Sequence, residues 1–233
     1  MSFDVLPWLH GYGGLLLTGL WRTIFIAVLG YALGLLLGLG LALLRSGSNR
    51  IVARVVKLYS GLLRALPELI VIMLLYYICG DAISWLLSHL GLGQIEIDGT
   101  WAAIIVLGLA TSAYATEIFG AAIRAVPSGA LEAAANLGMS RALCFRRITF
   151  PLMLPMALPG LANLWLMVVK GTSLVSVVGV MELALAAEQG AGATKEYFAF
   201  YLTAAALYLT LALITLKVFK QFELQMRRGQ VRL

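Results

Sequence analysis

Three ionisable side chains lie within long apolar stretches of the sequence, namely Glu68, Glu117 and Lys170. An ionisable group at the depth of a bilayer is costly unless it is paired or faces water, so each of the three is a candidate for a functional site. A carboxylate in such a position attracts a cationic group, and a lysine attracts an anionic one. The chemistry that these residues predict is therefore the recognition of a charged solute, or the formation of ion pairs inside the membrane.

For Glu68, the sequence leaves two interpretations open. The residue follows Pro67, whose missing N–H loosens a helix. Its carboxylate would favour a cationic side chain, such as that of arginine, lysine or protonated histidine. Arg64 lies four residues earlier on the same helical face and could pair with Glu68 instead. Glu68 is thus a candidate either for substrate contact or for a local ion pair.

Another apolar stretch holds Lys170, Thr172 and Ser173 around Gly171. A helix that breaks near the bilayer midplane exposes backbone groups that a substrate can satisfy, so we predict a gate at this position. The alternative is that Lys170 neutralises Glu117 or another buried carboxylate, because an unpaired charge there is costly.

Other polar side chains give weaker indications. Glu117 lies about two turns from one end of its apolar stretch, and we favour a structural hydrogen-bonding role over substrate contact. Tyr76 and Tyr114 could line a solute path, but aromatic residues in such segments more often serve packing. His10 and His89 are isolated, and no nucleophile, base and orienting group occur at a recognisable spacing. Neither a metal site nor a catalytic site is predicted.

Membrane-spanning helices must position these residues. Of the 233 residues, 61% are hydrophobic and 12% are charged, whereas soluble domains carry about 25% charged residues. Roughly 20 apolar residues cross the hydrocarbon core of a bilayer. Five stretches reach that length, near residues 14–44, 55–79, 101–123, 154–182 and 197–219. We expect one all-α integral membrane domain, residues 1–233, with about five transmembrane helices in a lipid bilayer.

The distribution of positive charge predicts the orientation of the chain. If the N-terminus is outside, 14 of the 17 lysines and arginines fall in inner segments, and only Arg22, Lys170 and Lys195 do not. Positive residues concentrate on the cytoplasmic side of membrane proteins, so we predict a periplasmic N-terminus and a cytoplasmic C-terminus. The net charge of +6 is explained in this way, and no binding of nucleic acid is predicted.

Glycines recur at every fourth position of the first predicted helix, at Gly30, Gly34 and Gly38. They share one helical face, and bare positions of this kind let a second helix approach closely. We predict a packing seam here and no ligand site.

The segment between the third and fourth predicted helices is VPSGALEAAANLGMSRALCFRRITFPLMLP, residues 126–155. It predicts two short helices, the first capped by Ser128 and ending at Gly138, the second capped by Ser140 and ending before Pro151. Helices this short are marginal in water, so they gain order by docking. We favour docking on a protein partner over contact with anionic lipid headgroups.

The residues of this segment carry a resemblance to a known family. Glu132, Ala133 and Ala134, followed by Gly138, Ile148 and Pro151, resemble the EAA loop of type I ABC importer permeases. The resemblance implies the fold of these permeases and makes residues 126–151 a cytoplasmic coupling loop that fits a cleft on an ATP-binding subunit. Arg141 would border this contact.

Further stretches are similar to the polar amino acid permease family, namely residues 62–77, 112–129 and 170–183. Residues 93–109 and the basic tail resemble its permease subunits for histidine, arginine, lysine, ornithine and opines. Phe119 and Gly120 stand where most members have arginine and glycine, which weakens a finer substrate assignment.

The resemblance also implies partners. This chain would pair with a second, related permease, preferably as a heterodimer, in the inner membrane of a bacterium. It would receive an amino acid from a periplasmic binding protein. ATP and Mg²⁺ would bind to the separate ATPase subunit, and no cofactor is expected in this chain. In agreement, its nearest approach to the phosphate-binding loop GxxxxGK[ST], at residues 188–197, lacks the Gly-Lys pair.

Two other classes of function compete with this interpretation. A secondary transporter or channel for small solutes would show inverted repeats, of which the sequence has no convincing example, and would act without an ATPase. A membrane-embedded enzyme would need a cluster of catalytic or metal-binding residues.

Overall fold

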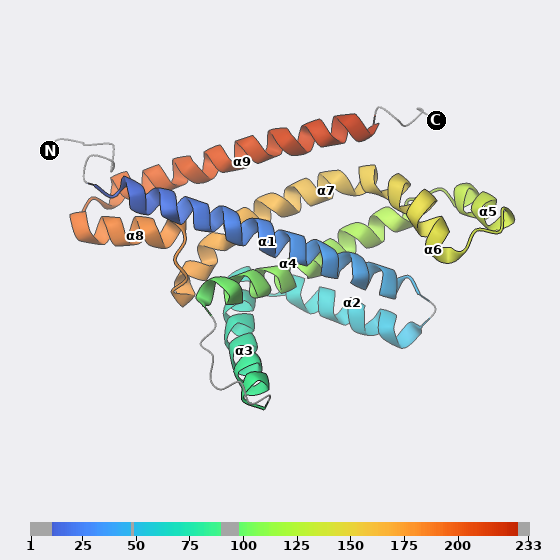
Figure 1. Cartoon of the computed structure of the whole chain (residues 1–233), viewed down its shortest axis with the longest axis horizontal. Coiled ribbons are helices and arrows are strands. Elements are labelled where there is room, and N and C mark those ends of the chain that lie inside the picture. The colour runs from blue at the N-terminus through green and yellow to red at the C-terminus, as the bar shows by residue number, and fades with distance from the viewer. Residues whose placement is uncertain (1–10, 48, 90–97, 228–233) are drawn as a thin grey trace.

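The computed structural model describes residues 11–47, 49–89 and 98–227, and all regular structure in these ranges is helical. Four long helices run side by side along the molecule (Figure 1): α1 (Gly13–Arg45), α4 (Gly99–Arg124), α7 (Phe150–Gly171) and α9 (Tyr197–Arg227). Four helical segments of the described chain are long and apolar enough to cross a membrane, and a bent helix pair raises this number to 5. The prediction of an all-α membrane protein with about five spans is confirmed.

The predicted glycine seam forms the contact between α1 and α4. A Cβ atom added at Gly30 would lie 3.2 Å from Leu107 Cβ, and one at Gly34 would lie 2.6 Å from Thr111 Cβ. Gly38 likewise faces Ala115. The two helices can approach this closely because the seam lacks side chains on one side.

The predicted second span, over residues 55–79, does not form one straight helix. It consists of two helices, α2 (Arg50–Ala65) and α3 (Glu68–His89), and the chain bends by 119° between them. Leu66, between them, has extended backbone angles, as steric contact with the Pro67 ring requires of a residue before proline. In Figure 1, α2 lies along α1, whereas α3 projects away from the other helices.

The helix after Ser140 does not end before Pro151, contrary to the prediction. It continues from α6 (Arg141–Cys144) through a π-helical turn, η2 (Phe145–Thr149), into α7. A proline ring clashes with the carbonyl of the residue four positions earlier, here Arg147, and the wider π turn makes room for it. The predicted coupling loop, residues 126–151, called the coupling segment below, is therefore joined directly to a membrane-spanning helix.

The predicted break beside Gly171 is confirmed. There α7 gives way to a 3₁₀ helix, η3 (Thr172–Val178), so the span ends at Val178 and not at residue 182. Gly179 then adopts φ +85°, a left-handed conformation that suits glycine, and the chain turns into α8 (Leu183–Thr194).

The molecule has two distinct ends (Figure 1). One end, called the α5 end below, holds α5 (Ser128–Asn136), α6, the turn from α1 to α2, and the C-terminal part of α9. The other, called the α8 end, holds α8 and the N-terminal parts of α1 and α9. The start of α2, the α5–α6 region and the C-terminal part of α9, which all carry basic residues, thus lie at the α5 end.

Candidate functional site

Glu68 stands at the first residue of α3, where the free backbone N–H groups of a helix start favour a carboxylate. Its Oε1 atom lies so close to Gly171 that a Cβ there would be 2.9 Å away. The charge of Lys170 acts on this carboxylate. Within the described part of the chain, no donor or cation lies within bonding distance of Glu68. Among these residues, no bonded cation neutralises the charge of Glu68.

The local ion pair between Arg64 and Glu68, which the sequence left open, is not formed. Arg64 Nη2 lies 3.6 Å from Glu117 Oε1, and Arg64 Nε donates to the carbonyl of Ser60. The break at Pro67 explains this, because the two residues no longer share a helical face.

A small cavity adjoins Glu68. It is lined by Thr111 and Tyr114 of α4 and by apolar residues of α4 and α7, namely Leu107, Ala110, Leu164, Met167 and Val168. Its volume of about 10 Å³ is at the limit for one water molecule, whereas small-molecule sites usually measure about 300–1,000 Å³. The cavity therefore admits no molecule larger than water between these helices.

The residues of the predicted gate differ in exposure. Lys170 is exposed, whereas Thr172 is fully buried and donates to the carbonyl of Val169 at 2.7 Å. Ser173 is half-buried and donates to the carbonyl of Lys170 at 2.7 Å. Both hydroxyls satisfy carbonyls at the end of α7, which leaves Lys170 as the charged group of this segment.

Glu117 is the centre of a separate polar cluster. Its Oε1 atom accepts hydrogen bonds from Arg45 Nη1 at 2.6 Å and from Ser60 Oγ at 2.9 Å, and Arg64 is nearby. The cluster ties the end of α1 and the C-terminal half of α2 to α4, just before the position where α3 begins with Glu68. Lys170 does not neutralise Glu117, because the two arginines do.

Glu117→Gln is expected to lower the free energy of unfolding by about 1–3 kcal/mol, because it leaves Arg45 and Arg64 without a counter-charge. The arginine and glutamate side chains of the closest pair are only 22% and 23% exposed, so water compensates little. Thermal unfolding of the purified protein in detergent measures the change. A change in solute selectivity at unaltered stability would instead assign Glu117 to the solute path.

Tyr76 does not join the Glu68 site. It is half-buried on α3, stacks edge-on against Tyr77 with ring centroids 5.8 Å apart, and packs against the apolar cluster around Ile72 and Val175. Of the two predicted tyrosines, Tyr114 is the one that the fold brings beside Glu68.

The coupling segment projects at the α5 end. Glu132, Ala133 and Gly138 are exposed, and so are Arg141 and Pro151. Ala134 is buried and Ile148 half-buried, so these two residues pack inward. The outer surface offers a mixture of small, acidic and basic side chains to a partner.

The end of α5 is built as the sequence indicated. Gly138 adopts φ +69°, its N–H donates to the carbonyl of Ala135, and the N–H of Met139 donates to that of Ala134. Ser140 caps α6 by accepting from the N–H of Leu143, whereas Ser128 is the first helical residue of α5 and not its cap. At this turn, at the end of α5, the side chain of Leu137 is 80% exposed. Sequence reasoning missed Leu137.

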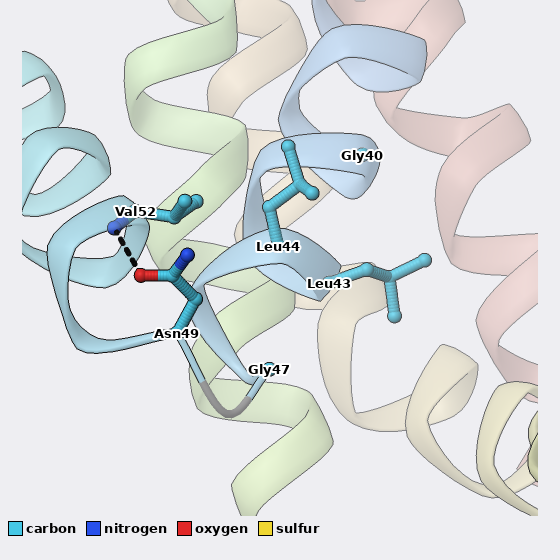
Figure 2. A pocket seen from close by; sticks show the side chains of 6 residues that line it. All are labelled: Gly40, Leu43, Leu44, Gly47, Asn49 and Val52. Atoms are coloured by element: carbon cyan, nitrogen blue, oxygen red, sulfur yellow. Dashed lines mark hydrogen bonds between the residues drawn. The ribbon is translucent and has the colours of Figure 1, made fainter.

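A larger hollow of about 540 Å³ lies where α1 turns into α2 (Figure 2). Its lining consists of Gly40, Leu43, Leu44, Gly47 and Val52, with Asn49 as the polar member. The Asn49 side chain is occupied in capping α2, since it accepts from the N–H groups of Ile51 and Val52. The hollow thus offers no charged group to an ionic solute.

Sequence reasoning also missed Glu182, which is completely buried between α1, α8 and α9. In the sequence, Glu182 is only an acidic residue at the end of an apolar stretch. That position is equally compatible with a buried residue and with a residue of an exposed loop. For metal ions, no group of three histidine, cysteine, aspartate or glutamate side chains comes together in residues 11–47, 49–89 and 98–227. His10 lies outside these ranges.

Known proteins resemble this chain over nearly its whole length. The family described as "binding-protein-dependent transport system inner membrane component" matches residues 13–228. The histidine/lysine/arginine/ornithine transport system permease protein HisQ of Escherichia coli (strain K12) is 35% identical over 207 residues, which cover 89% of this chain and 91% of that protein. The octopine transport system permease protein OccQ of Rhizobium radiobacter is 36% identical over 221 residues, covering 94% of this chain and 93% of its own.

Solved structures agree in fold. A chain in the crystal structure of an amino acid ABC transporter with histidines has a TM-score of 0.79 at 30% identity, covering 97% of this chain and 100% of that one. A chain of the MetNI methionine ABC transporter, in an inward facing conformation, has a TM-score of 0.73 at 17% identity and covers 92% of this chain and 97% of its own, a likeness of fold alone. With its apolar helices and exposed coupling segment, this chain therefore belongs to the family of binding-protein-dependent transport system inner membrane components and is a multi-pass permease subunit.

Proposed function

We propose that this chain is a permease subunit of an ATP-driven importer for basic amino acids or opines, and that Glu68 and Lys170 recognise the charged groups of the substrate. The observation that carries the proposal is the Glu68 carboxylate, which faces α4 and the end of α7 without a bonding partner among the described residues. The relatives named for histidine, lysine, arginine, ornithine or octopine transport support the same class of substrate.

The two charges suit the two parts of a basic amino acid. Its cationic side chain complements Glu68, and its α-carboxylate complements Lys170. Outside bulk water such interactions are stronger, because the effective dielectric constant is lower. Glu68 and Lys170 also act on each other electrostatically, which places their opposite charges near one another for the two ends of such a substrate.

The closed cavity beside Tyr114 fits a transporter that must change conformation to pass its substrate. We propose alternating access in a complex with a second, related permease as a heterodimer. Two ATP-binding subunits, which hold ATP and Mg²⁺, would dock on the coupling segments at the cytoplasmic α5 end. A periplasmic binding protein would deliver substrate at the α8 end. ATP binding would draw the coupling segments together and open the path outward, and hydrolysis would return it inward.

Glu68→Gln, tested in the assembled transporter, is expected to reduce kcat/KM for arginine or lysine at least about tenfold, because one ionic hydrogen bond to the substrate is lost. Transport of a neutral amino acid should change much less. Uptake of radiolabelled substrates into proteoliposomes measures both. Glu188→Gln, which removes the same charge from an exposed position of α8, serves as the matched control.

Equal losses for cationic and neutral substrates would reject charge recognition by Glu68. The assembly is tested separately, by purifying the chain from its native membrane in mild detergent and measuring ATPase activity. Recovery of an ATP-binding subunit and a second permease is the expected result. A chain that moves solute alone, without an ATPase, would be a secondary transporter or channel instead.

A further inference from the structure

The carboxylate of Glu182, which has no part in the function proposed above, is 0% exposed and gathers donors from three helices. Its Oε1 atom accepts from the N–H groups of Ala184 at 2.7 Å and Leu185 at 3.0 Å, at the start of α8. Its Oε2 atom accepts from Thr23 of α1 at 3.2 Å and from Tyr208 of α9. No described cation lies within ion-pair distance. The carboxylate is thus satisfied by hydrogen bonds and by the helix start alone.

Thr23 connects α1 to this cluster in two directions. Its hydroxyl donates to Glu182 and accepts from the N–H of Leu183 at 3.1 Å. One turn earlier, a Cβ added at Gly19 would lie 2.8 Å from Ala186 Cβ. The start of α8 is therefore held firmly against α1, both by polar contacts and by close packing.

Tyr208 joins α9 to the end of the segment that η3 and the turn at Gly179 form. Its hydroxyl donates to Glu182. Glu182 stands four residues after Val178, the last residue of η3, so this contact anchors the C-terminal end of the segment to α9. Lys170 and Gly171, which lie beside Glu68, directly precede the segment.

We propose that Glu182 is a positioning residue for transport, whose contacts with Thr23 and Tyr208 hold η3, and with it Lys170, in the closed position. A 3₁₀ helix has poorer hydrogen-bond geometry than an α-helix, so the place of η3 depends on its anchors. The hydrogen bonds of such a buried network are all formed in one arrangement of the helices, and a distorted arrangement that leaves a polar group unpaired is energetically costly. Movement of α9 or α1 against α8 is thereby passed to the residues beside Glu68. The proposal rests on the transport function proposed above.

Tyr208→Phe and Thr23→Val each remove one hydroxyl of the network and are tested in the complete transporter in proteoliposomes. We expect the number of ATP molecules hydrolysed per amino acid imported to rise about fivefold, because a loosened gate no longer opens only with substrate. Tyr201→Phe, at an exposed position of the same helix, is the matched control for Tyr208→Phe. Thr23→Ser keeps the hydroxyl and should restore wild-type coupling.

A second measurement does not depend on activity. Spin labels report the distance between η3 and α9. They are attached to cysteines at two exposed positions, Val177→Cys in η3 and Leu202→Cys in α9. The native Cys79 and Cys144 are replaced by serine. Tyr208→Phe should broaden the distance distribution, and Tyr201→Phe should not. Unchanged coupling or an unchanged distribution in Tyr208→Phe would overturn the proposal. If the wild-type complex imported no amino acid, the proposed transport function would be rejected. The spin-label distances would still test whether the Glu182 network holds η3 in place.

Discussion

Replacing Gly34 by alanine is expected to destabilise the protein by about 2–3 kcal/mol, because it overfills the seam between α1 and α4. The new Cβ would lie 2.6 Å from both Thr111 Cβ and Thr111 Cγ2, and 3.1 Å from the carbonyl oxygen of Gly108. The Gly108 oxygen belongs to the backbone of α4 and Thr111 Cβ is bonded directly to it, so the two helices must move apart. Thermal unfolding in detergent and the yield of monodisperse protein measure the loss. Gly34→Leu should prevent folding.

Gly40→Ala provides the control on the same helix. A Cβ at Gly40 meets no atom within 4 Å, so we expect no loss of stability and a gain of up to about 1 kcal/mol from better helix propensity. If Gly34→Ala and Gly40→Ala unfolded at the same temperature, the α1–α4 seam would not be the tight contact described above.

Replacing Leu137 by aspartate is expected to weaken binding of the ATP-binding subunit by about 2–4 kcal/mol, the range of a central contact residue in an interface. Leu137 is 80% exposed at the tip of the coupling segment, and the left-handed turn at Gly138 holds it there. An exposed leucine at such a site gains its contact energy only from a partner. Co-purification of the ATP-binding subunit and import into proteoliposomes should both fall.

Leu137→Met tests whether the contact is apolar. It keeps a side chain of similar size and hydrophobicity, so binding and import should stay close to wild type. Folding of the permease itself should be unaffected in both variants, because Leu137 covers no other part of the described chain. Wild-type import by Leu137→Asp would show that the ATP-binding subunit docks elsewhere.

Features that depend on neighbouring residues could be predicted from the sequence. The glycine face at Gly34, the end of α5 at Gly138 and the helix break at Gly171 all follow from local spacing and backbone preference. Long apolar stretches likewise predicted the membrane helices, since crossing a bilayer requires their length whatever they pack against. The same local reasoning erred where proline was involved, at the sharp bend before Pro67 and in the helix that continues through Pro151.

Partners that lie far apart in the chain could not be predicted in this way. Arg45 is 72 residues from Glu117, and Thr23 is 159 residues from Glu182. By itself, the sequence determined that this is a helical membrane protein with charges at bilayer depth and a projecting coupling segment. The tertiary structure alone decided which charges are paired. Glu117 and Glu182 find donors only because the bundle brings α1, α2, α4, α8 and α9 together, and the bend at Pro67 separates Glu68 from Arg64, so its carboxylate has no bonded cation among the described residues.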